Sequence, residues 1–358
     1  MSHSVKRRPR QADVARLAGV SPTTVSLVLN NRVGGNVRIR PETRQRVLDA
    51  VARLGYVADP AARSLAGGQN RLLGVFTFEA IFPIQQRDFY YPFLVGIERE
   101  AGRLGYDLLL FTSSTGTDGK RRLYQRGNNR LRMADGAVLL GNEENKQELS
   151  RLLAEGYPFV FVGRREVPGG ELSYVAADYT TATAQVLAHF FAHGHRRVAY
   201  LAHPIETESM ADRRAGYRLA HREAGLEPDP NLLFQRPSAE ITAAWLHTLR
   251  AQGITGMVTE MGEHVPALMA AIHAAGWSLP GDFSLAFLGD PHLNDDHDDL
   301  PRDCTTFTIP REEMGIQAVR LLTQMLSNPE GGGPRRLTLP CRFVPGSTVG
   351  PPPPLPNP

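Results

Sequence analysis

Apolar residues recur at helical spacing in two short segments between residues 11 and 30. Each segment places three of them at positions i, i+3 and i+4, namely Val14, Leu17 and Ala18, and then Val25, Val28 and Leu29. Gly19 and Val20 separate the segments and predict a turn. Ser21 can cap the second helix with its hydroxyl, and Pro22 suits the first helical position. The pattern is typical of a helix-turn-helix, although an ordinary pair of surface helices shares it.

A third helix follows, and residues 1–58 together form the first predicted domain. Pro41 takes the first position of this helix, and Gly55 ends it. Its expected core face consists of Val47, Val51 and Leu54.

The next segment, residues 59–71, is predicted to be a hinge helix followed by a linker. Asp59, Pro60 and Gly67 supply the start and stop signals of a helix shorter than two turns. Such a helix is marginal in water, so we expect it to form only where something supports it. Leu65 can insert as an apolar wedge between base steps of a minor groove, or pack against the body as a linker residue.

From residue 72 onward, short apolar segments alternate with amphipathic helices. The apolar segments are residues 72–78, 107–113, 136–141 and 158–163, and then 197–202, 254–260 and 283–289. Strands that are apolar on both faces and separated by helices predict parallel sheets of the α/β class. The two series separate near residues 172–180. We therefore expect two doubly wound lobes over residues 72–350, with a ligand crevice at the carboxyl ends of the strands, and a proline-rich tail at 351–358 that is extended or disordered.

Charge is distributed unevenly along the 358 residues. The net charge is only +3, but residues 1–71 hold thirteen Lys and Arg against four acids, a charge of +9. The remaining chain holds 27 basic and 33 acidic residues, a charge of −6. A basic module attracts polyanions, whereas an acidic body is repelled by them. The charge pattern therefore favours contact with DNA through the N-terminal end.

Composition argues against export and against a membrane protein. The basic N-terminus lacks the apolar segment of a secretory signal, and no apolar stretch approaches the length of a membrane span. Only Cys304 and Cys341 are present, too few for a disulfide framework. We expect a cytoplasmic protein.

Motifs for catalysis, cofactors and metals are weak or missing. We find no G-x-S-x-G, no phosphate-binding loop and no dinucleotide glycine motif, so we expect no catalytic residues and no cofactor. His189 and His193 have the i, i+4 spacing of metal ligands, but histidines at a helix end explain them better. The acidic loop around Asp295 can hold a divalent cation or simply be a solvated run of charge. We therefore expect no metal site.

The chain resembles the lac repressor/galactose repressor family of bacterial transcription regulators over nearly its whole length. The matching landmarks are D-V-A-R-L-A-G-V-S…T-V-S-L-V-L-N, R-P-E-T-R-Q-R-V-L…L-G-Y, A-R-S-L-A-G, G-I-E-R-E-A…G-Y-D-L-L-L, V-A-A-D, G-H-R-R-V-A-Y, R-R-A-G-Y-R and C-T-T-F-T-I-P…M-G. The resemblance implies a homodimer whose heads bind half-sites of a pseudo-palindromic double-stranded operator. It also implies paired hinge helices in the minor groove and a body like that of periplasmic binding proteins, with an effector between its lobes.

The resemblance also implies which residues contact DNA. By position, Pro22, Thr23 and Leu27 would face base edges, and Ser21, Thr24, Ser26 and Asn30 would lie near phosphates. Arg38, Arg63 and the hinge residue Leu65 complete the expected DNA-binding set. Leu27 can contact a thymine methyl group but cannot make the bidentate pair that recognises guanine.

In the crevice, the chain matches the family only in part. The expected effector-binding residues are Tyr91, Phe93, Arg164, Asp178, Arg213, Glu260 and Asp290. Arg164, Asp178 and Arg213 can instead form an Arg–Asp pair that joins the lobes. Glu260 replaces an amide of the family pattern, and Pro237 stands where an aromatic often stacks on a sugar ring. We therefore expect an effector of unknown identity that is not an ordinary hexose.

These observations favour a DNA-binding transcription regulator, and we expect a repressor controlled by a small molecule. One alternative is a small-molecule binding protein of the periplasmic type, but such a protein needs an export signal and does not need residues 1–71. Another alternative is an enzyme with an appended DNA-binding module, which would need a catalytic constellation in the crevice.

Overall fold

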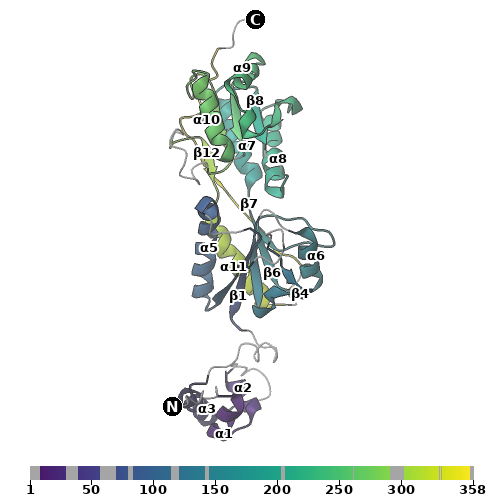
Figure 1. The fold of residues 1–358 in the computed structure, drawn as a ribbon, viewed down its shortest axis with the longest axis vertical. Helices are drawn as coiled ribbons and strands as arrows, with labels where there is room; N and C mark the ends of the chain where they lie inside the picture. The colour runs from purple at the N-terminus through teal and green to yellow at the C-terminus, as the bar shows by residue number, and fades with distance from the viewer. Residues whose placement is uncertain are drawn as a thin grey trace, which may run out of the picture. The chain divides into compact units, whose positions relative to one another are not determined.

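The computed structural model describes residues 9–29, 39–56, 70–79, 84–113, 121–141, 145–202, 206–260, 262–290, 302–329, 331 and 333–354. The chain divides after Leu72 into two compact units (Figure 1). The predicted hinge helix from Asp59 to Gly67 and the acidic loop around Asp295 lie outside the described residues.

The N-terminal unit contains α1 (Gln11–Ala18), α2 (Pro22–Leu29) and α3 (Pro41–Leu54). These are the three helices predicted from the apolar spacing. Gly19 and Gly55 follow α1 and α3 in left-handed conformation, with φ of 65° and 58°. The three helices enclose a small core of Val14, Ala15, Ala18, Val25, Val28, Val47 and Ala50.

One predicted core position in α1 is wrong. Leu17 is 45% exposed, whereas Ala15 is buried. The helix has only eight residues, and the stripe that packs on the other two helices runs through Val14, Ala15 and Ala18. Leu17 lies outside this stripe, on the exposed side of α1.

The first lobe of the C-terminal unit is built on a six-stranded sheet. Its strands are β1 (Leu72–Thr77), β2 (Asp107–Phe111), β5 (Gly136–Leu140), β6 (Phe159–Val162), β7 (Tyr174–Ala177) and β13 (Arg336–Leu339), in the order β13-β7-β6-β5-β1-β2. The pairs from β13 to β1 are parallel. Helices α5 (Ile84–Arg103) and α11 (Arg311–Ser327) share a core with one face of the sheet, and α6 (Lys146–Ala154) and η1 (Arg130–Met133) with the other. A small hairpin, β3 (Tyr124–Gln125) and β4 (Asn128–Asn129), precedes η1.

The second lobe repeats this design on a smaller parallel sheet. Its strands are β8 (Val198–Ala202), β9 (Leu233–Gln235), β10 (Gly256–Thr259) and β11 (Ser284–Phe287), in the order β11-β10-β8-β9. Helices α7 (Tyr179–Ala192) and α8 (Glu208–Glu223) pack on one face, and α9 (Ala243–Ala251) and α10 (Val265–Ala274) on the other. Three short 3₁₀ helices complete the lobe: η2 (Pro230–Leu232), η3 (Ser238–Glu240) and η4 (Gly262–His264).

All seven predicted strands form, but the lobes are not consecutive in sequence. The chain passes between them after β7, between β12 (Thr306–Thr308) and α11, and between β13 and β14 (Arg342–Val344) (Figure 1). The C-terminal helix α11 and strand β13 therefore belong to the first lobe. The apolar pattern misses β13 because this edge strand alternates exposed and half-buried residues.

The beginning of the proline-rich tail is ordered against the second lobe. Pro353 is buried, and the carbonyl of Pro354 accepts a hydrogen bond from Arg250 Nη2 at 3.1 Å. The remaining tail residues, 355–358, lie outside the described residues. Among the helices that the structure describes, none is long and apolar enough to cross a membrane.

Two glycines allow α5 and α11 to pack closely. A Cβ atom at Gly96 of α5 would lie 2.0 Å from the carbonyl oxygen of Glu312. A Cβ atom at Gly315 of α11 would lie 2.3 Å from the carbonyl oxygen of Phe93. The two helix backbones therefore touch where they cross, and this contact brings the start of α11 next to the aromatic residues of α5.

Replacing Gly96 by alanine should destabilise the protein, because backbone atoms of α11 must move away. We expect Gly96→Ala to lower the free energy of unfolding by about 1–3 kcal/mol in a urea titration. The matched control is Gly102→Ala in the same helix, where a Cβ atom meets nothing within 4 Å. That substitution should stabilise by about 0.5–1 kcal/mol. Equal effects of the two substitutions would contradict the close crossing.

A buried carboxylate also joins these helices. Glu100 of α5 is 3% exposed and accepts hydrogen bonds from Arg103 Nη2 and from Arg320 Nε of α11, both at 2.7 Å. These hydrogen bonds from Arg103 and Arg320 outweigh burial and lower the pKa of Glu100 to about 2. The folded state therefore prefers the ionised carboxylate.

Because the pKa of Glu100 is lower in the folded protein, its contribution should be complete above pH 4.5 and vanish as the pH falls towards 2. At pH 7, we expect Glu100→Gln to lower the free energy of unfolding by about 1–3 kcal/mol. In chemical denaturation at decreasing pH, the difference from wild type should shrink below pH 4.5. Glu98→Gln, at an exposed position of the same helix, serves as the control. A difference that does not depend on pH would argue against this role of the carboxylate.

Candidate functional site

The first candidate site is the start of α2 in the N-terminal unit. Ser21 caps this helix, since its Oγ accepts the backbone N–H of Thr24 at 3.2 Å and lies 2.9 Å from Thr24 Oγ1. The amide of Gln11 in α1 donates to the carbonyl oxygen of Pro22 at 2.9 Å and ties the two helices together. The first turn of α2 is thereby held in a fixed position.

This helix start presents small polar groups to solvent. Ser21, Pro22 and Thr23 are exposed, and Thr24, Ser26 and Leu27 are half-buried. Around these helices, residues 9–29 and 39–56 hold only three acids but six exposed arginines, which are Arg10, Arg16, Arg40, Arg44, Arg46 and Arg53. Short hydroxyl side chains and surrounding guanidinium groups suit phosphate and base edges. The other predicted DNA contacts, Asn30, Arg38, Arg63 and Leu65, lie outside the described residues.

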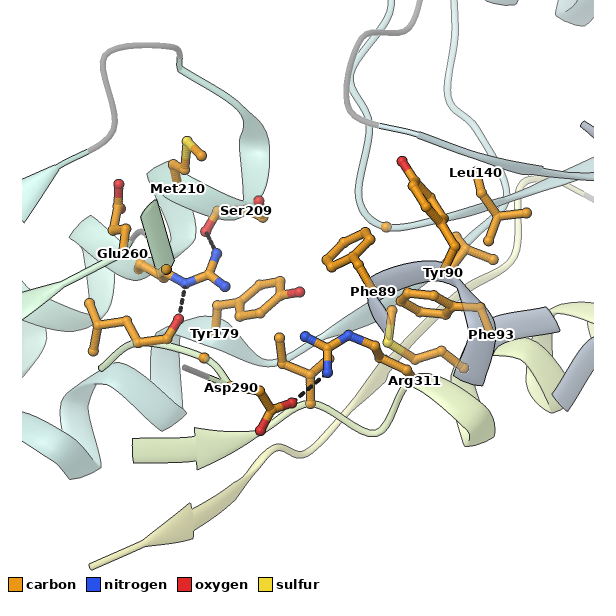
Figure 2. A pocket seen from close by; sticks show the side chains of 18 of the residues that line it. Phe89, Tyr90, Phe93, Leu140, Tyr179, Ser209, Met210, Glu260, Asp290 and Arg311 are labelled. Atoms are coloured by element: carbon orange, nitrogen blue, oxygen red, sulfur yellow. Dashed lines mark hydrogen bonds and ion pairs between the residues drawn. The ribbon is translucent and has the colours of Figure 1, made fainter. Parts of the chain in front are cut away.

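The second candidate site is a cavity of about 310 Å³ between the two lobes of the C-terminal unit. As predicted, it lies at the carboxyl ends of parallel strands, here β5, β6, β10 and β11. Figure 2 shows Phe89, Tyr90 and Phe93 of α5 on one side, and Tyr179, Ser209, Met210 and Glu260 on the other.

Four of the seven predicted effector-binding residues line this cavity: Phe93, Arg213, Glu260 and Asp290. The other three are not among its lining residues. Tyr91 is 58% exposed on α5. Asp178 caps α7 by accepting the backbone N–H of Thr181 at 2.9 Å. Arg164 binds Asp212 of α8 with both Nε and Nη2, at 3.2 and 2.8 Å. Arg164 thus forms an Arg–Asp pair that joins the lobes, with Asp212 in place of Asp178.

Arg164 belongs to a group of charges at the edge of the cavity, which we call the interlobe clasp. It consists of Lys146, Arg164 and Arg165 of the first lobe and Glu208 and Asp212 of the second. Lys146 Nζ lies 2.9 Å from Glu208 Oε1, and Arg165 Nη1 lies 3.8 Å from Glu208 Oε2. Burial alone would raise the pKa of Glu208, but hydrogen bonds led by that from Lys146 lower it. The clasp therefore holds the lobes together by charge.

Inside the cavity, Arg213 of α8 is 8% exposed. Its Nε donates to the carbonyl oxygen of Leu288 at 2.8 Å, and its Nη1 donates to that of Ser209 at 3.1 Å. Its guanidinium carbon lies 3.9 Å from the ring centroid of Tyr179. These contacts fix the guanidinium group at the cavity wall.

The two acids of the cavity already have partners. Asp290 forms an ion pair with Arg311 at the first position of α11 (Figure 2). Glu260 accepts a hydrogen bond from the hydroxyl of Tyr200. Burial raises the pKa of Tyr200 well above its usual value, so this hydroxyl remains a donor at neutral pH.

Arg165, Tyr179 and Arg311 also line the cavity, and no sequence motif singled them out. The only local signals for the two arginines are their places directly after V-G-R and I-P. Neither signal reveals that the chain returns to the first lobe at α11, and that return places Arg311 opposite Asp290.

The histidine pair at the end of α7 does not form part of a larger ligand cluster. The rings of His189 and His193 lie 4.5 Å apart, and His193 Nδ1 lies 2.9 Å from the carbonyl oxygen of His189. Burial lowers the pKa of His189. Within the described ranges, no group of three or more His, Cys, Asp or Glu residues is arranged to hold a metal ion.

Two family models match this chain. Residues 12–59 match the model of the bacterial regulatory proteins of the lacI family, and residues 187–349 match a periplasmic binding protein-like domain. The HTH-type transcriptional regulator CelR of Thermobifida fusca is 30% identical over 93% of this chain and 96% of its own. Catabolite control protein A of Priestia megaterium is 26% identical over 88% and 92%.

Solved structures show the same architecture. The complex of the transcriptional regulator CelR with cellobiose has a TM-score of 0.62 at 26% identity and covers 95% of this chain and 100% of its own. The lac repressor dimer bound to operator and the anti-inducer ONPF has a TM-score of 0.65 at 22% identity, with 96% and 100% coverage. With the capped α2 and the two-lobed body, these similarities show that the chain belongs to the lacI family of bacterial regulatory proteins and is a DNA-binding transcription regulator.

Proposed function

We propose that this protein is a repressor that works as a homodimer in the cytoplasm, binds a pseudo-palindromic operator and responds to a small effector in its crevice. The observation that carries the proposal is the capped, polar start of α2 among exposed arginines, in the same chain as a two-lobed body with a charged cavity. The relatives are transcription regulators, and we propose no catalytic step for this chain.

For DNA recognition, we propose that α2 enters the major groove. Pro22, Thr23 and Leu27 then face base edges, while Ser21 and Thr24 approach phosphates. Ser26 joins the phosphate contacts, as do Asn30, Arg38 and Arg63, and Leu65 acts as the hinge wedge in the minor groove. Leu27 offers only apolar contact, so the base pair that it faces is recognised through a thymine methyl group or through DNA shape.

Exposed apolar side chains of the first lobe support a dimer. Tyr91 on α5 is 58% exposed, and Leu110 on the edge strand β2 is 46% exposed. A dimer covers such groups and places two helix-turn-helix heads on one DNA molecule, which matches a pseudo-palindrome. Two linked heads also bind more tightly than one, because the second contact is intramolecular.

For regulation, we propose that the effector acts through lobe closure. The cavity takes residues from both lobes, so a molecule bound there favours one degree of closure. It changes DNA affinity by the difference between its affinities for the two states. Before any effector binds, the interlobe clasp determines the equilibrium between the open and closed arrangements of the lobes.

The test of DNA binding is a selection from randomised duplex DNA, followed by gel shifts of the selected site at increasing salt. We expect a pseudo-palindrome without strict guanine at the position that faces Leu27, and an affinity that falls steeply with salt. Thr23→Glu should weaken binding at least tenfold, because it places a carboxylate among phosphates. Thr248→Glu makes the same change on α9 of the body and should have no effect. Affinity that depends on neither salt nor sequence would contradict the proposal.

The test of the clasp is hydrogen–deuterium exchange of the whole chain. Asp212→Asn removes the second-lobe carboxylate that Arg164 binds, so we expect about two- to tenfold faster exchange in the peptides around residues 163–167 and 206–212. Asp229→Asn removes an ion pair with Arg197 inside the second lobe and should leave those peptides unchanged. Unchanged exchange at the crevice edge in Asp212→Asn would rule out a clasp that controls closure.

A further inference from the structure

Arg213 is a buried cation with no acidic partner. Its Nε and Nη1 donate to two carbonyl oxygens, which are neutral acceptors. Among the described residues, no carboxylate lies within 4.0 Å of its guanidinium group, and its Nη2 donates no hydrogen bond. Burying a cation is costly unless an opposite charge accompanies it. The guanidinium group therefore has both charge and a donor left for a molecule in the cavity.

The other charged groups of the cavity do not compensate Arg213 directly. Asp290 is paired with Arg311, and Glu260 accepts from Tyr200. Arg165, the third arginine of the lining, already lies 3.8 Å from Glu208 in the interlobe clasp. Nε of Arg311 is buried without a partner among the described residues, which leaves a second donor unused. The cavity therefore has unused donors on two buried arginines, Arg213 and Arg311.

The first turns of two helices also line the cavity. Ser209 and Met210 in the first turn of α8 line the cavity, and so do Arg311 and Met314 at the start of α11. Neither helix has a side-chain hydrogen bond at its N-cap. The helix dipole favours negative charge at such ends, but Glu208 in the first turn of α8 and Glu312 and Glu313 in that of α11 already supply it. The buried arginines are therefore the groups of this cavity that call for an anion.

We propose that the effector of this regulator is a small organic anion whose carboxylate or phosphate group binds Arg213. The proposal rests on the effector-controlled function proposed above and names the chemical class of the effector. The anionic group accepts the free N–H bonds of Arg213 Nη2, and the rest of the molecule lies towards Phe89 of the first lobe (Figure 2). A cavity of about 310 Å³ limits the effector to a small molecule.

The test is calorimetry on the full chain without DNA, using four probes. Glucose is the neutral probe, gluconate and glucose 6-phosphate carry a carboxylate or a phosphate on a related skeleton, and inorganic phosphate supplies the anion alone. We expect saturable binding of at least one anion, and we expect the affinity for glucose to be at least tenfold lower than the affinity for that anion. The two organic anions distinguish a carboxylate site from a phosphate site.

Variants then assign the binding to Arg213. Arg213→Gln should weaken binding of that anion at least tenfold, and Arg213→Lys should have an intermediate effect, because it keeps the charge but loses the fork of donors. Arg218→Gln changes an exposed arginine of the same helix and should bind as wild type does. Melting temperatures measured without probe show whether each variant is folded. If Arg213→Gln does not fold, the anion affinity of Arg213→Lys tests the proposal instead.

Three outcomes would overturn the proposal: no saturable binding of any anion, glucose binding as tightly as the anions, or equal anion affinity in wild type and both Arg213 variants. None of them depends on DNA. Loss of the proposed DNA-binding function would show instead in the selection and in the Thr23→Glu gel shift, which use no probe. The two failures are therefore distinguishable.

Discussion

Parallel pairing of strands is the constraint on which the cavity depends. In each lobe the strands that end at the cavity are parallel, so their carboxyl ends and the helix starts that follow them gather at one edge of the sheet. The three passages of the chain between the lobes hold these two edges against each other. The cavity is therefore lined by strand ends and first helical turns from both lobes, where N–H groups point outward and side chains of distant segments meet.

Charged side chains have different roles at the edge of this cavity and inside it. Outside, Glu208 and Asp212 meet cations of the opposite lobe, so the charges are satisfied by the protein itself. Inside, Arg213 contacts neutral carbonyl groups and an aromatic ring. A charge that is paired within the protein is compensated, whereas an unpaired buried charge costs several kcal/mol. The charges at the edge can therefore determine how far the lobes close, and the unpaired charge inside can bind a ligand of opposite charge.

The sequence predicts those elements whose formation depends on neighbouring residues alone. The spacing of Val25, Val28 and Leu29 and the Ser21–Pro22 start predict α2 and its cap, and the doubly apolar segments predict the central strands. It does not predict β13, which as an edge strand has exposed alternate residues, nor the return of the chain at α11. It therefore selects Arg213 from a local motif but misses Arg311, because only the long-range crossing brings Arg311 to Asp290.

An effector can act on lobe closure because the cavity offers it contacts from both lobes. A ligand shifts an equilibrium only by its difference in affinity between the states, so it must contact parts that move relative to one another. Arg213 and Glu260 belong to the second lobe, and Phe89 and Arg311 belong to the first. A molecule held by Arg213 alone would bind open and closed forms equally well. One that also reaches Phe89 or the unused Nε of Arg311 gains those contacts only when the lobes close, and this difference is the energy available to the switch.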